Sequence, residues 1–304
     1  MIGEAFSLGA ALCWSVGVIL FRRSLSVSPL AANLFKNAVA MGLMLATLLV
    51  TLPATGGLHM DRSTEDWLRL ILSGFLGISL SDLLFFHALR YMGPGRLAVV
   101  ECAYAPSVVA FSVPFLGERP TLGFAVGAVL VVMGMVVVTR PGPAARLPQN
   151  ADPAAKALLL RGTLLGVGAM LTSGLAIVVA KPAFGSGSLA EISLIRLLAG
   201  TAGQVLYMLP SRERRGALAE LRGSQVWRTL LPATILGSWL STIMWIGGFK
   251  YTDASVAAVL NQTATVWTLL LSRVLLGEPL TRRGVLGVAL GFTGALAVLL
   301  TRVS

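Results

Sequence analysis

The segment Leu97–Leu116, LAVVECAYAPSVVAFSVPFL, decides the fold because it is long and apolar enough to cross a lipid bilayer. A helix rises ~1.5 Å per residue, so this segment matches the ~30 Å hydrocarbon core of a membrane. Its single charged residue is Glu101. A carboxylate in the hydrocarbon region is costly unless it is paired, protonated or hydrated. We therefore expect Glu101 to mark the functional site of a membrane protein.

The composition of the whole chain agrees with a polytopic membrane protein. Of its 304 residues, 56% are hydrophobic and 12% are charged, whereas soluble domains carry about 25% charged residues. The net charge of +11 does not indicate a nucleic-acid partner, because the basic residues lie at the ends of apolar segments, where they meet lipid headgroups. Cys13 and Cys102 lie within apolar segments, and His59 and His87 are far apart, so we predict no disulfide, metal site or cofactor.

Ten apolar segments are expected to form ten membrane-spanning helices. They cover residues 5–21, 29–52, 68–89, 95–116, 121–139, 158–180, 189–209, 229–249, 254–276 and 281–301. Residues 141–157 contain several prolines and no apolar periodicity, which is typical of a linker. We therefore divide the chain into a first five-helix repeat, residues 1–140, this linker, and a second five-helix repeat, residues 158–304. The arginine-rich segment 211–228 is predicted to form a short helix on the membrane surface.

The two halves of the chain are similar in sequence. A shift of 160 residues lays residues 77–138 on residues 237–298 without a gap. Identical matched pairs include Ser81/Ser241, Tyr91/Tyr251, Val99/Val259, Ser112/Ser272, Gly127/Gly287 and Gly134/Gly294. Because each repeat contains five helices, the second enters the membrane from the opposite side. We therefore predict two inverted five-helix repeats around a central cavity, an all-α arrangement typical of secondary transporters.

Three short motifs add a family resemblance to this layout. Trp14 lies in the first helix, Arg196 lies near the start of the seventh, and the element Leu-Gly-Glu-x-x-Thr stands at residues 116–121 and again at 276–281. With the doubled five-helix layout, these features resemble the EamA-type families of the drug/metabolite transporter superfamily. The resemblance covers nearly the whole chain. It implies ten helices around a central cavity and the export of amino acids, metabolites or drugs.

Counting residues from the helix ends places three charged side chains at one depth. Lys36, Asp82 and Glu101 each lie about two turns, or ~10 Å, below the same membrane face. Clustered charges in a low dielectric have perturbed pKa values. We therefore predict that Glu101 and Asp82 form a proton- or substrate-coupling site with Lys36 as their partner. The alternative is a structural ion pair between Lys36 and Glu101 that holds the second helix on the fourth.

The second half carries different polar residues at the matching positions. Glu101 is matched by Asn261, which Gln262 follows, and Arg196 is matched by Asn37. We predict that Arg196, Asn261 and Gln262 orient a polar or anionic group of the substrate. A purely structural network would tend to keep the same residues in both halves, so the asymmetry favours a functional role.

Aromatic residues within the helices are candidates for the walls of the cavity. Tyr104 follows Glu101 by three residues and so shares its helix face. Trp14 and Trp245 also lie within predicted helices. Ordinary packing inside the bundle is the alternative for each of them.

Glycine pairs and helix-end carboxyls are expected to have structural roles. Gly123/Gly127 and Gly287/Gly291 have the GxxxG spacing that lets helices approach closely. We expect this contact within one chain, so that the protein is a monomer, with a dimer as the alternative. Glu118 and Glu278, in the two Leu-Gly-Glu elements, are expected to be structural.

The sequence therefore predicts a secondary active transporter in the cell (inner) membrane. It would export small polar or amphipathic metabolites such as amino acids by alternating access, with protons as the candidate coupling ion. The alternatives are a channel or a lipid-handling protein. An enzyme is disfavoured because no HExxH or GxSxG motif is present. The excess of basic residues in the odd-numbered loops places those loops in the cytoplasm, whereas the family resemblance implies the reverse orientation.

Overall fold

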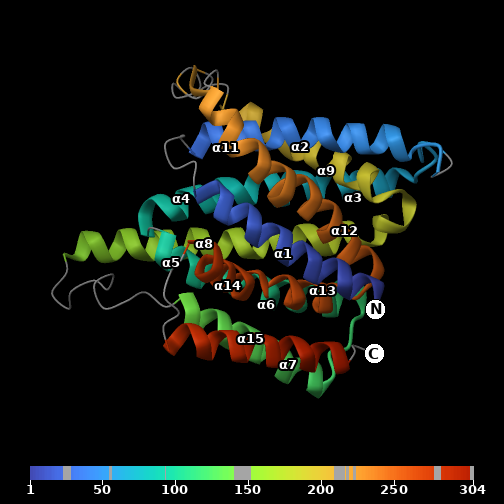
Figure 1. The fold of residues 1–304 in the computed structure, drawn as a ribbon. Helices are drawn as coiled ribbons and strands as arrows, with labels where there is room; N and C mark the ends of the chain where they lie inside the picture. The colour runs from blue at the N-terminus through green and yellow to red at the C-terminus, as the bar shows by residue number, and fades with distance from the viewer. Residues whose placement is uncertain are drawn as a thin grey trace.

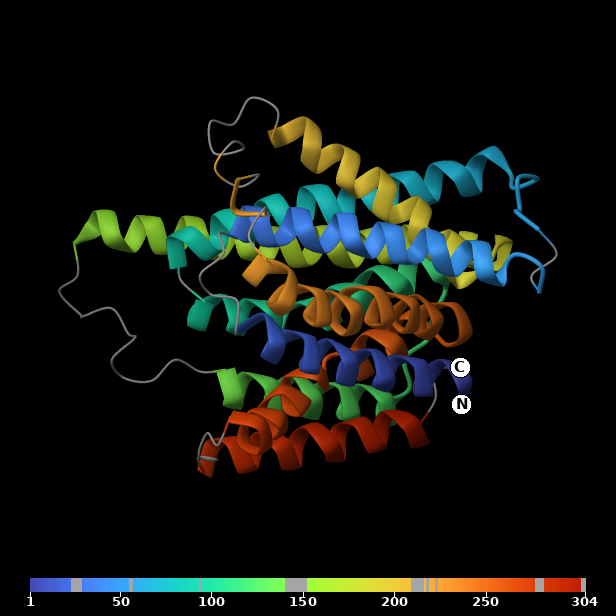
Figure 2. The same cartoon turned by 45° about the horizontal axis from the view of Figure 1, so that its top comes forward.

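The computed structural model describes residues 1–22, 29–54, 57–92, 94–139, 152–208, 216, 219–221, 224–276 and 282–301. Figures 1 and 2 show long helices side by side, with both chain termini at the same end of the bundle. We call this end the terminal face. It also carries the links at 57–63, 117–121, 187–188 and 252–253. The other end is the opposite face.

The described part of each half of the chain is built from helices. The first half contains α1 (Ile2–Arg22), α2 (Pro29–Thr51), α3 (Thr64–Gly74), the π-helix η1 (Phe75–Leu80), α4 (Ser81–Met92), α5 (Pro94–Glu101), α6 (Tyr104–Leu116) and α7 (Leu122–Thr139). The second half contains α8 (Pro153–Ala180), the 3-10 helix η3 (Lys181–Ser186), α9 (Leu189–Met208), α11 (Ser224–Thr234), the π-helix η4 (Ile235–Leu240), α12 (Ser241–Tyr251), α13 (Ala254–Asn261), α14 (Ala264–Leu276) and α15 (Arg282–Leu300).

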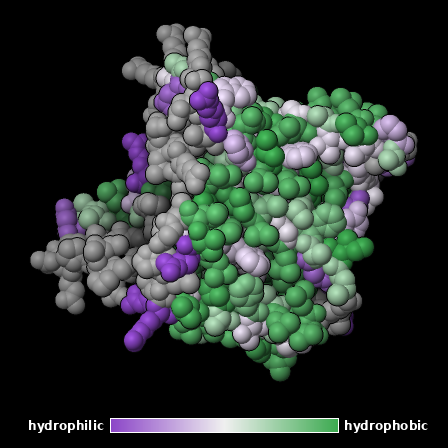
Figure 3. Space-filling view, viewed as in Figure 1, coloured by the Kyte–Doolittle hydropathy of each residue, from purple (hydrophilic) through white to green (hydrophobic). Residues whose placement is uncertain are grey.

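The helices have the length and apolar surface that a bilayer requires. Within the described ranges, nine stretches are long and apolar enough to cross a membrane, and α7 is a further, shorter apolar helix. Figure 3 shows apolar side chains over most of the visible face, with hydrophilic side chains gathered at the left edge, the opposite face. Large apolar residues such as Leu45, Leu49 and Leu164 are exposed on this surface. The prediction of an all-α polytopic membrane protein is confirmed.

The structure corrects one predicted helix boundary, and one predicted helix lies partly outside the described residues. Helix α8 begins at Pro153, within the predicted linker, because Asp152 accepts a hydrogen bond from the backbone N–H of Ala154 at 3.0 Å and proline is favourable at the first helical position. The linker is therefore shorter than predicted. Half of the predicted surface helix at 211–228 lies outside the described residues, and its last part, from Ser224, belongs to α11.

The predicted fourth and ninth helices are each broken in the middle, which hydropathy did not predict. In the fourth, α5 ends at Glu101 and α6 begins at Tyr104, and Pro106 has no N–H to donate to the carbonyl of Cys102. In the ninth, α13 ends at Asn261 and α14 begins at Ala264, although no proline is present there. The breaks recur 160 residues apart, as do η1 and η4. The element boundaries thus follow the sequence repeat, while the inverted relation of the two halves stays a prediction.

Glycines bring α7 and α15 into close contact. A Cβ atom at Gly127 would lie 2.8 Å from the carbonyl oxygen of Gly294, and one at Gly134 would lie 2.7 Å from the carbonyl oxygen of Gly287. A Cβ at Gly291 would lie 2.5 Å from Val266. The faces that carry the predicted GxxxG spacing are therefore occupied by helices of the same chain.

This contact leads to a first prediction. Gly127→Leu is expected to lower the free energy of unfolding by about 1–3 kcal/mol, because a side chain there overfills the α7–α15 contact. The control is Gly42→Leu on α2, where a Cβ meets nothing within 4 Å. Thermal unfolding in detergent measures the difference, and equal unfolding midpoints for the two variants would contradict the close contact.

Candidate functional site

The two helix breaks contact each other. The side-chain Nε2 of Gln262 donates a hydrogen bond of 3.1 Å to the backbone carbonyl of Glu101, so each break contributes one partner. We call Glu101, Asn261 and Gln262 the central crossing. It unites three residues that the sequence predicted for the site, at the place where broken helices of transporters bind their substrates and ions.

Two side chains at the central crossing lack hydrogen-bond partners among the described residues. The side chain of Glu101 forms no hydrogen bond or ion pair with any of them. Both polar atoms of the Asn261 amide are buried without such a partner. Buried polar groups are normally hydrogen-bonded. A carboxyl and an amide with free hydrogen-bonding capacity therefore lie where a ligand, water or proton can bind.

Gln204 of α9 joins two other predicted site residues. Its Oε1 accepts a hydrogen bond of 2.7 Å from Asn37, and its Nε2 donates to Asp82 Oδ2 at 2.9 Å and to the carbonyl of Ile78 at 2.8 Å. We call Asn37, Gln204 and Asp82 the amide bridge. Sequence reasoning missed Gln204, although a signal was present. It lies eight residues after Arg196, on the same side of a mostly apolar helix.

Among the described residues, no ion pair joins Lys36, Asp82 and Glu101 to one another. The charge of Lys36 acts on Asp82, but none of the ion pairs among the described residues joins Lys36 to Glu101. Helix α2 packs against α9 and η4, whereas α5 packs against α4, α7 and α8. The predicted Lys36–Glu101 ion pair is therefore not formed, because the two side chains belong to helices with different neighbours.

Arg196 lies among aromatic rings instead of beside Asn261 and Gln262. It is 4% exposed, and its guanidinium carbon is 5.4 Å from the ring centroid of Trp245 and 5.9 Å from that of Phe184. Tyr104, the first residue of α6, lies within electrostatic range of Arg196. Among the described residues, Nη1 of Arg196 has no hydrogen-bond partner, and the hydroxyl of Tyr104, near the indole N–H of Trp245, has no acceptor for its own proton. We call Arg196, Trp245, Phe184 and Tyr104 the arginine cage.

Trp14 takes no part in these three clusters. It is 44% exposed on α1, and no contact with Arg196 or Glu101 is present among the described ring interactions. Phe184 is the cage residue that sequence reasoning missed, because it lies in the short helix η3 at the end of a predicted span.

Charged residues at the terminal face hold the two halves of the chain together. Arg62 Nη2 lies 3.0 Å from Glu191 Oε1, and Arg62 Nε donates to the carbonyl of Ser186 at 2.8 Å. His59 Nδ1 lies 3.0 Å from Glu191 Oε2. We call Arg62, His59 and Glu191 the terminal latch, because it ties the link after α2 to the start of α9. The sequence analysis assigned none of these contacts.

A second contact between the halves at the terminal face involves Glu118. Its Oε1 accepts from the backbone N–H of Ala254 at 2.6 Å, and its Oε2 accepts from that of Ser255 at 3.0 Å, so it caps α13. On the same face, and within the second half of the chain, Lys181 Nζ donates a hydrogen bond of 2.9 Å to the backbone carbonyl of Phe249. The structural role predicted for Glu118 fits this geometry. Glu278 lies outside the described residues.

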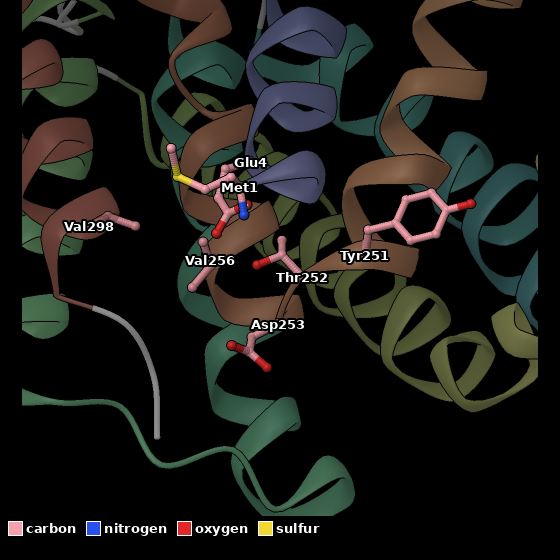
Figure 4. A pocket seen from close by; sticks show the side chains of 7 residues that line it. All are labelled: Met1, Glu4, Tyr251, Thr252, Asp253, Val256 and Val298. Carbon is pink, nitrogen blue, oxygen red and sulfur yellow. The ribbon is translucent and has the colours of Figure 1, made fainter.

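A cavity of about 250 Å³ opens at the terminal face, separate from the predicted site residues (Figure 4). Its lining consists of Met1, Glu4, Tyr251, Thr252, Asp253, Val256 and Val298. Burial raises the pKa of Asp253, Glu118 adds to this rise, and Lys181 opposes it. The lining carries the carboxyl groups of Glu4 and Asp253 and the N-terminal ammonium group of Met1, which lies 2.7 Å from Glu4 Oε2. The cavity lies beside the Glu118 cap and away from the central crossing.

Comparisons with known proteins agree with this architecture. Residues 1–140 and 160–300 match the EamA-like transporter family. An uncharacterized transporter of Archaeoglobus fulgidus (strain ATCC 49558 / DSM 4304 / JCM 9628 / NBRC 100126 / VC-16) is 27% identical over 143 residues, 47% of this chain and 50% of the relative, so the match spans about half the length of this curated relative. A solved crystal structure has the same fold, with a TM-score of 0.79 at 18% identity over 99% of this chain and 97% of its own. The chain belongs to the EamA-like transporter family and is a multi-pass membrane protein.

Proposed function

We propose that the chain is a secondary active transporter that exports small polar or amphipathic metabolites and couples their movement to protons at Glu101. One observation carries the coupling: the side chain of Glu101 has no partner among the described residues, although it lies where two broken helices meet. A carboxylate in such a place is costly, whereas a protonated carboxyl is not. Protonation and deprotonation would then accompany opposite states of the transport cycle.

The arrangement of the polar clusters supports alternating access. The terminal latch and the Glu118 cap join the two halves of the chain at the terminal face. Both sets of contacts must break before a substrate can leave through that face. A proton or substrate at the central crossing would act on the same equilibrium, since a ligand shifts a conformational equilibrium by its differential affinity for the two states. The cell (inner) membrane is the proposed location.

The experiment that tests coupling compares matched glutamate variants in proteoliposomes. A panel of amino acids, organic acids, nucleobases and cationic drugs is first screened for thermal stabilisation of the purified protein. The best stabiliser is then used as a labelled substrate with and without an imposed pH gradient. The control is Glu65→Gln, whose side chain is 70% exposed on α3.

We expect the gradient to accelerate uptake several-fold in the wild type and in Glu65→Gln. Uptake by Glu101→Gln should be insensitive to the gradient, because an amide cannot carry the proton. If Glu101→Gln keeps the full response to the gradient, Glu101 is not the coupling residue.

A further inference from the structure

We propose that the arginine cage binds the carboxylate of an amphipathic monocarboxylate, an organic anion with one carboxyl group and an aliphatic or aromatic body. This inference deepens the proposed function and rests on it, because it assigns the substrate class of the same transporter. It concerns a different cluster from the proton site, so the two can be tested separately.

Arg196 is a buried cation, and no residue of the described chain supplies an anion to pair with it. Its side chain lies in a membrane-spanning helix, where charged groups normally pair with one another. Glu191, on the same helix, pairs with Arg62 and His59, Asp82 accepts from Gln204, and no described ion pair joins Glu101 to Arg196. The guanidinium Nη1 is buried without a hydrogen-bond partner among the described residues. The missing anion is then expected to come from the substrate.

The hydroxyl of Tyr104 is a second hydrogen-bond donor close to the Arg196 guanidinium. This hydroxyl is buried near the indole N–H of Trp245 and within electrostatic range of Arg196, and no described residue accepts its own proton. A guanidinium and a hydroxyl together offer the two oxygens of a carboxylate directed N–H and O–H donors. Arg196 comes from α9 in the second half and Tyr104 from α6 in the first. A bound carboxylate would therefore link the two halves that move during transport.

The arginine cage can neutralise one negative charge on a ligand. Arg196 is the only cation of the cage, and the described lysines near the terminal face, Lys181 and Lys250, donate to backbone carbonyls. A phosphate dianion would need a second positive charge, and the ammonium group of an amino acid would need a carboxylate beside Arg196. No carboxylate acts on Arg196 electrostatically among the described residues. The charge balance favours a single carboxylate.

The surroundings of the cage are apolar, which favours an apolar group in the part of the substrate beyond its carboxylate. Phe184 belongs to the main apolar cluster of the bundle, and Tyr104 and Trp245 pack against it. Buried neighbours in that cluster include Ile177 and Ile192. Apolar surroundings stabilise an aliphatic or aromatic group by ~25 cal/mol per Å² removed from water. The cage is therefore suited to an anion whose remaining atoms are apolar.

The test measures binding of labelled 3-phenylpropanoate to the purified full-length protein. The wild type is expected to bind 3-phenylpropanoate, and 3-phenylpropan-1-ol, which has the same body without the carboxylate, should compete at least tenfold more weakly. Tyr104→Phe should weaken binding about tenfold, the effect of one hydrogen bond to a charged group. Arg196→Gln should weaken it more, and Arg196→Lys should also weaken it, because lysine lacks the bidentate fork.

The controls separate a local effect from misfolding and from failure of the proposed function. Arg161→Gln removes an exposed arginine that stacks on Tyr91 and should bind as the wild type does. Only variants that elute as a single species and keep a cooperative thermal transition are compared, and Tyr104→Phe is the conservative variant if Arg196→Gln fails to fold.

Three outcomes would overturn the inference. The first is equal competition by the alcohol and the acid. The second is unchanged binding by folded Arg196→Gln, or by Tyr104→Phe where Arg196→Gln does not fold. The third is tighter binding of phenylalanine or of 3-phenylpropyl phosphate than of 3-phenylpropanoate. If the inference fails while Glu101→Gln still abolishes the response of another solute to the pH gradient, the proposed function stands without it.

Discussion

Glu191→Ala is expected to lower the free energy of unfolding by about 3 kcal/mol and to loosen the terminal face. Glu191 is the carboxylate of the terminal latch, and the Arg62 side chain that it neutralises is 1% exposed. Removing one partner of a buried ion pair leaves the other charge uncompensated, which costs about 3–5 kcal/mol. We take the lower value, because the latch lies at the membrane face and Arg62 also keeps its hydrogen bond to the carbonyl of Ser186.

Two measurements check this prediction. Thermal unfolding in detergent reports stability, and labelling of a cysteine introduced at Ser188 reports opening of the terminal face, after Cys13 and Cys102 have been replaced. We expect labelling to be at least tenfold faster in Glu191→Ala, the factor that corresponds to ~1.4 kcal/mol.

The matched control for the latch is Glu65→Ala. Glu65 pairs with Arg69 on the surface of α3, where its side chain is 70% exposed. Exposed pairs of this kind contribute little, so the midpoint and the labelling rate should stay near those of the wild type. Equal behaviour of Glu191→Ala and Glu65→Ala would show that the terminal latch does not hold the face closed.

Glu118→Ala is expected to lower the free energy of unfolding by about 2–3 kcal/mol. The carboxylate accepts hydrogen bonds from the backbone N–H groups of Ala254 and Ser255, both of which are buried. Without it, the two donors at the start of α13 lose their acceptor in buried surroundings. Glu118→Gln keeps one acceptor oxygen and should fall between Glu118→Ala and the wild type.

The comparison for this cap is Asp152→Ala. Asp152 also caps a helix, accepting from Ala154 at 3.0 Å, but it does so at an exposed site. Water can solvate the freed N–H there, so the loss should be about 1 kcal/mol or less. Thermal unfolding of the three variants under one condition ranks them, and a larger effect at Asp152 than at Glu118 would refute the role of burial.

Much of the fold could be predicted from the sequence because each membrane span is a local property. Windowed hydropathy found every helix that the structure describes as a span, and the 160-residue repeat anticipated that Glu101 and Asn261 occupy matching positions. Both residues prove to be the last residue of a broken half-helix. The breaks were not predictable from hydropathy, because both segments still average as apolar over a membrane-length window.

The sequence predicted most residues of the central crossing, the amide bridge and the arginine cage. It did not predict which of them contact each other. Counting along a helix gives depth, since each residue rises ~1.5 Å. It does not give the rotation of the helix or the identity of its neighbours. Lys36 and Glu101 were therefore paired incorrectly, and Gln204, which joins Asn37 to Asp82, was missed. The functional roles of these residues stay predictions.

The sequence by itself determined that this chain is a helical membrane protein, where its spans lie and which family it resembles. Those features depend on the summed hydropathy and the residue pattern of neighbouring residues. Both can be read from the order of residues along the chain. Only the tertiary structure decided that Arg196 meets Trp245 and Phe184 while Glu191 meets Arg62. In a low dielectric, the state of a charged group depends on the few atoms within about 3–6 Å of it. Helices far apart in the sequence supply those atoms, so helix packing decides which charges are neutralised and which stay free to bind a substrate.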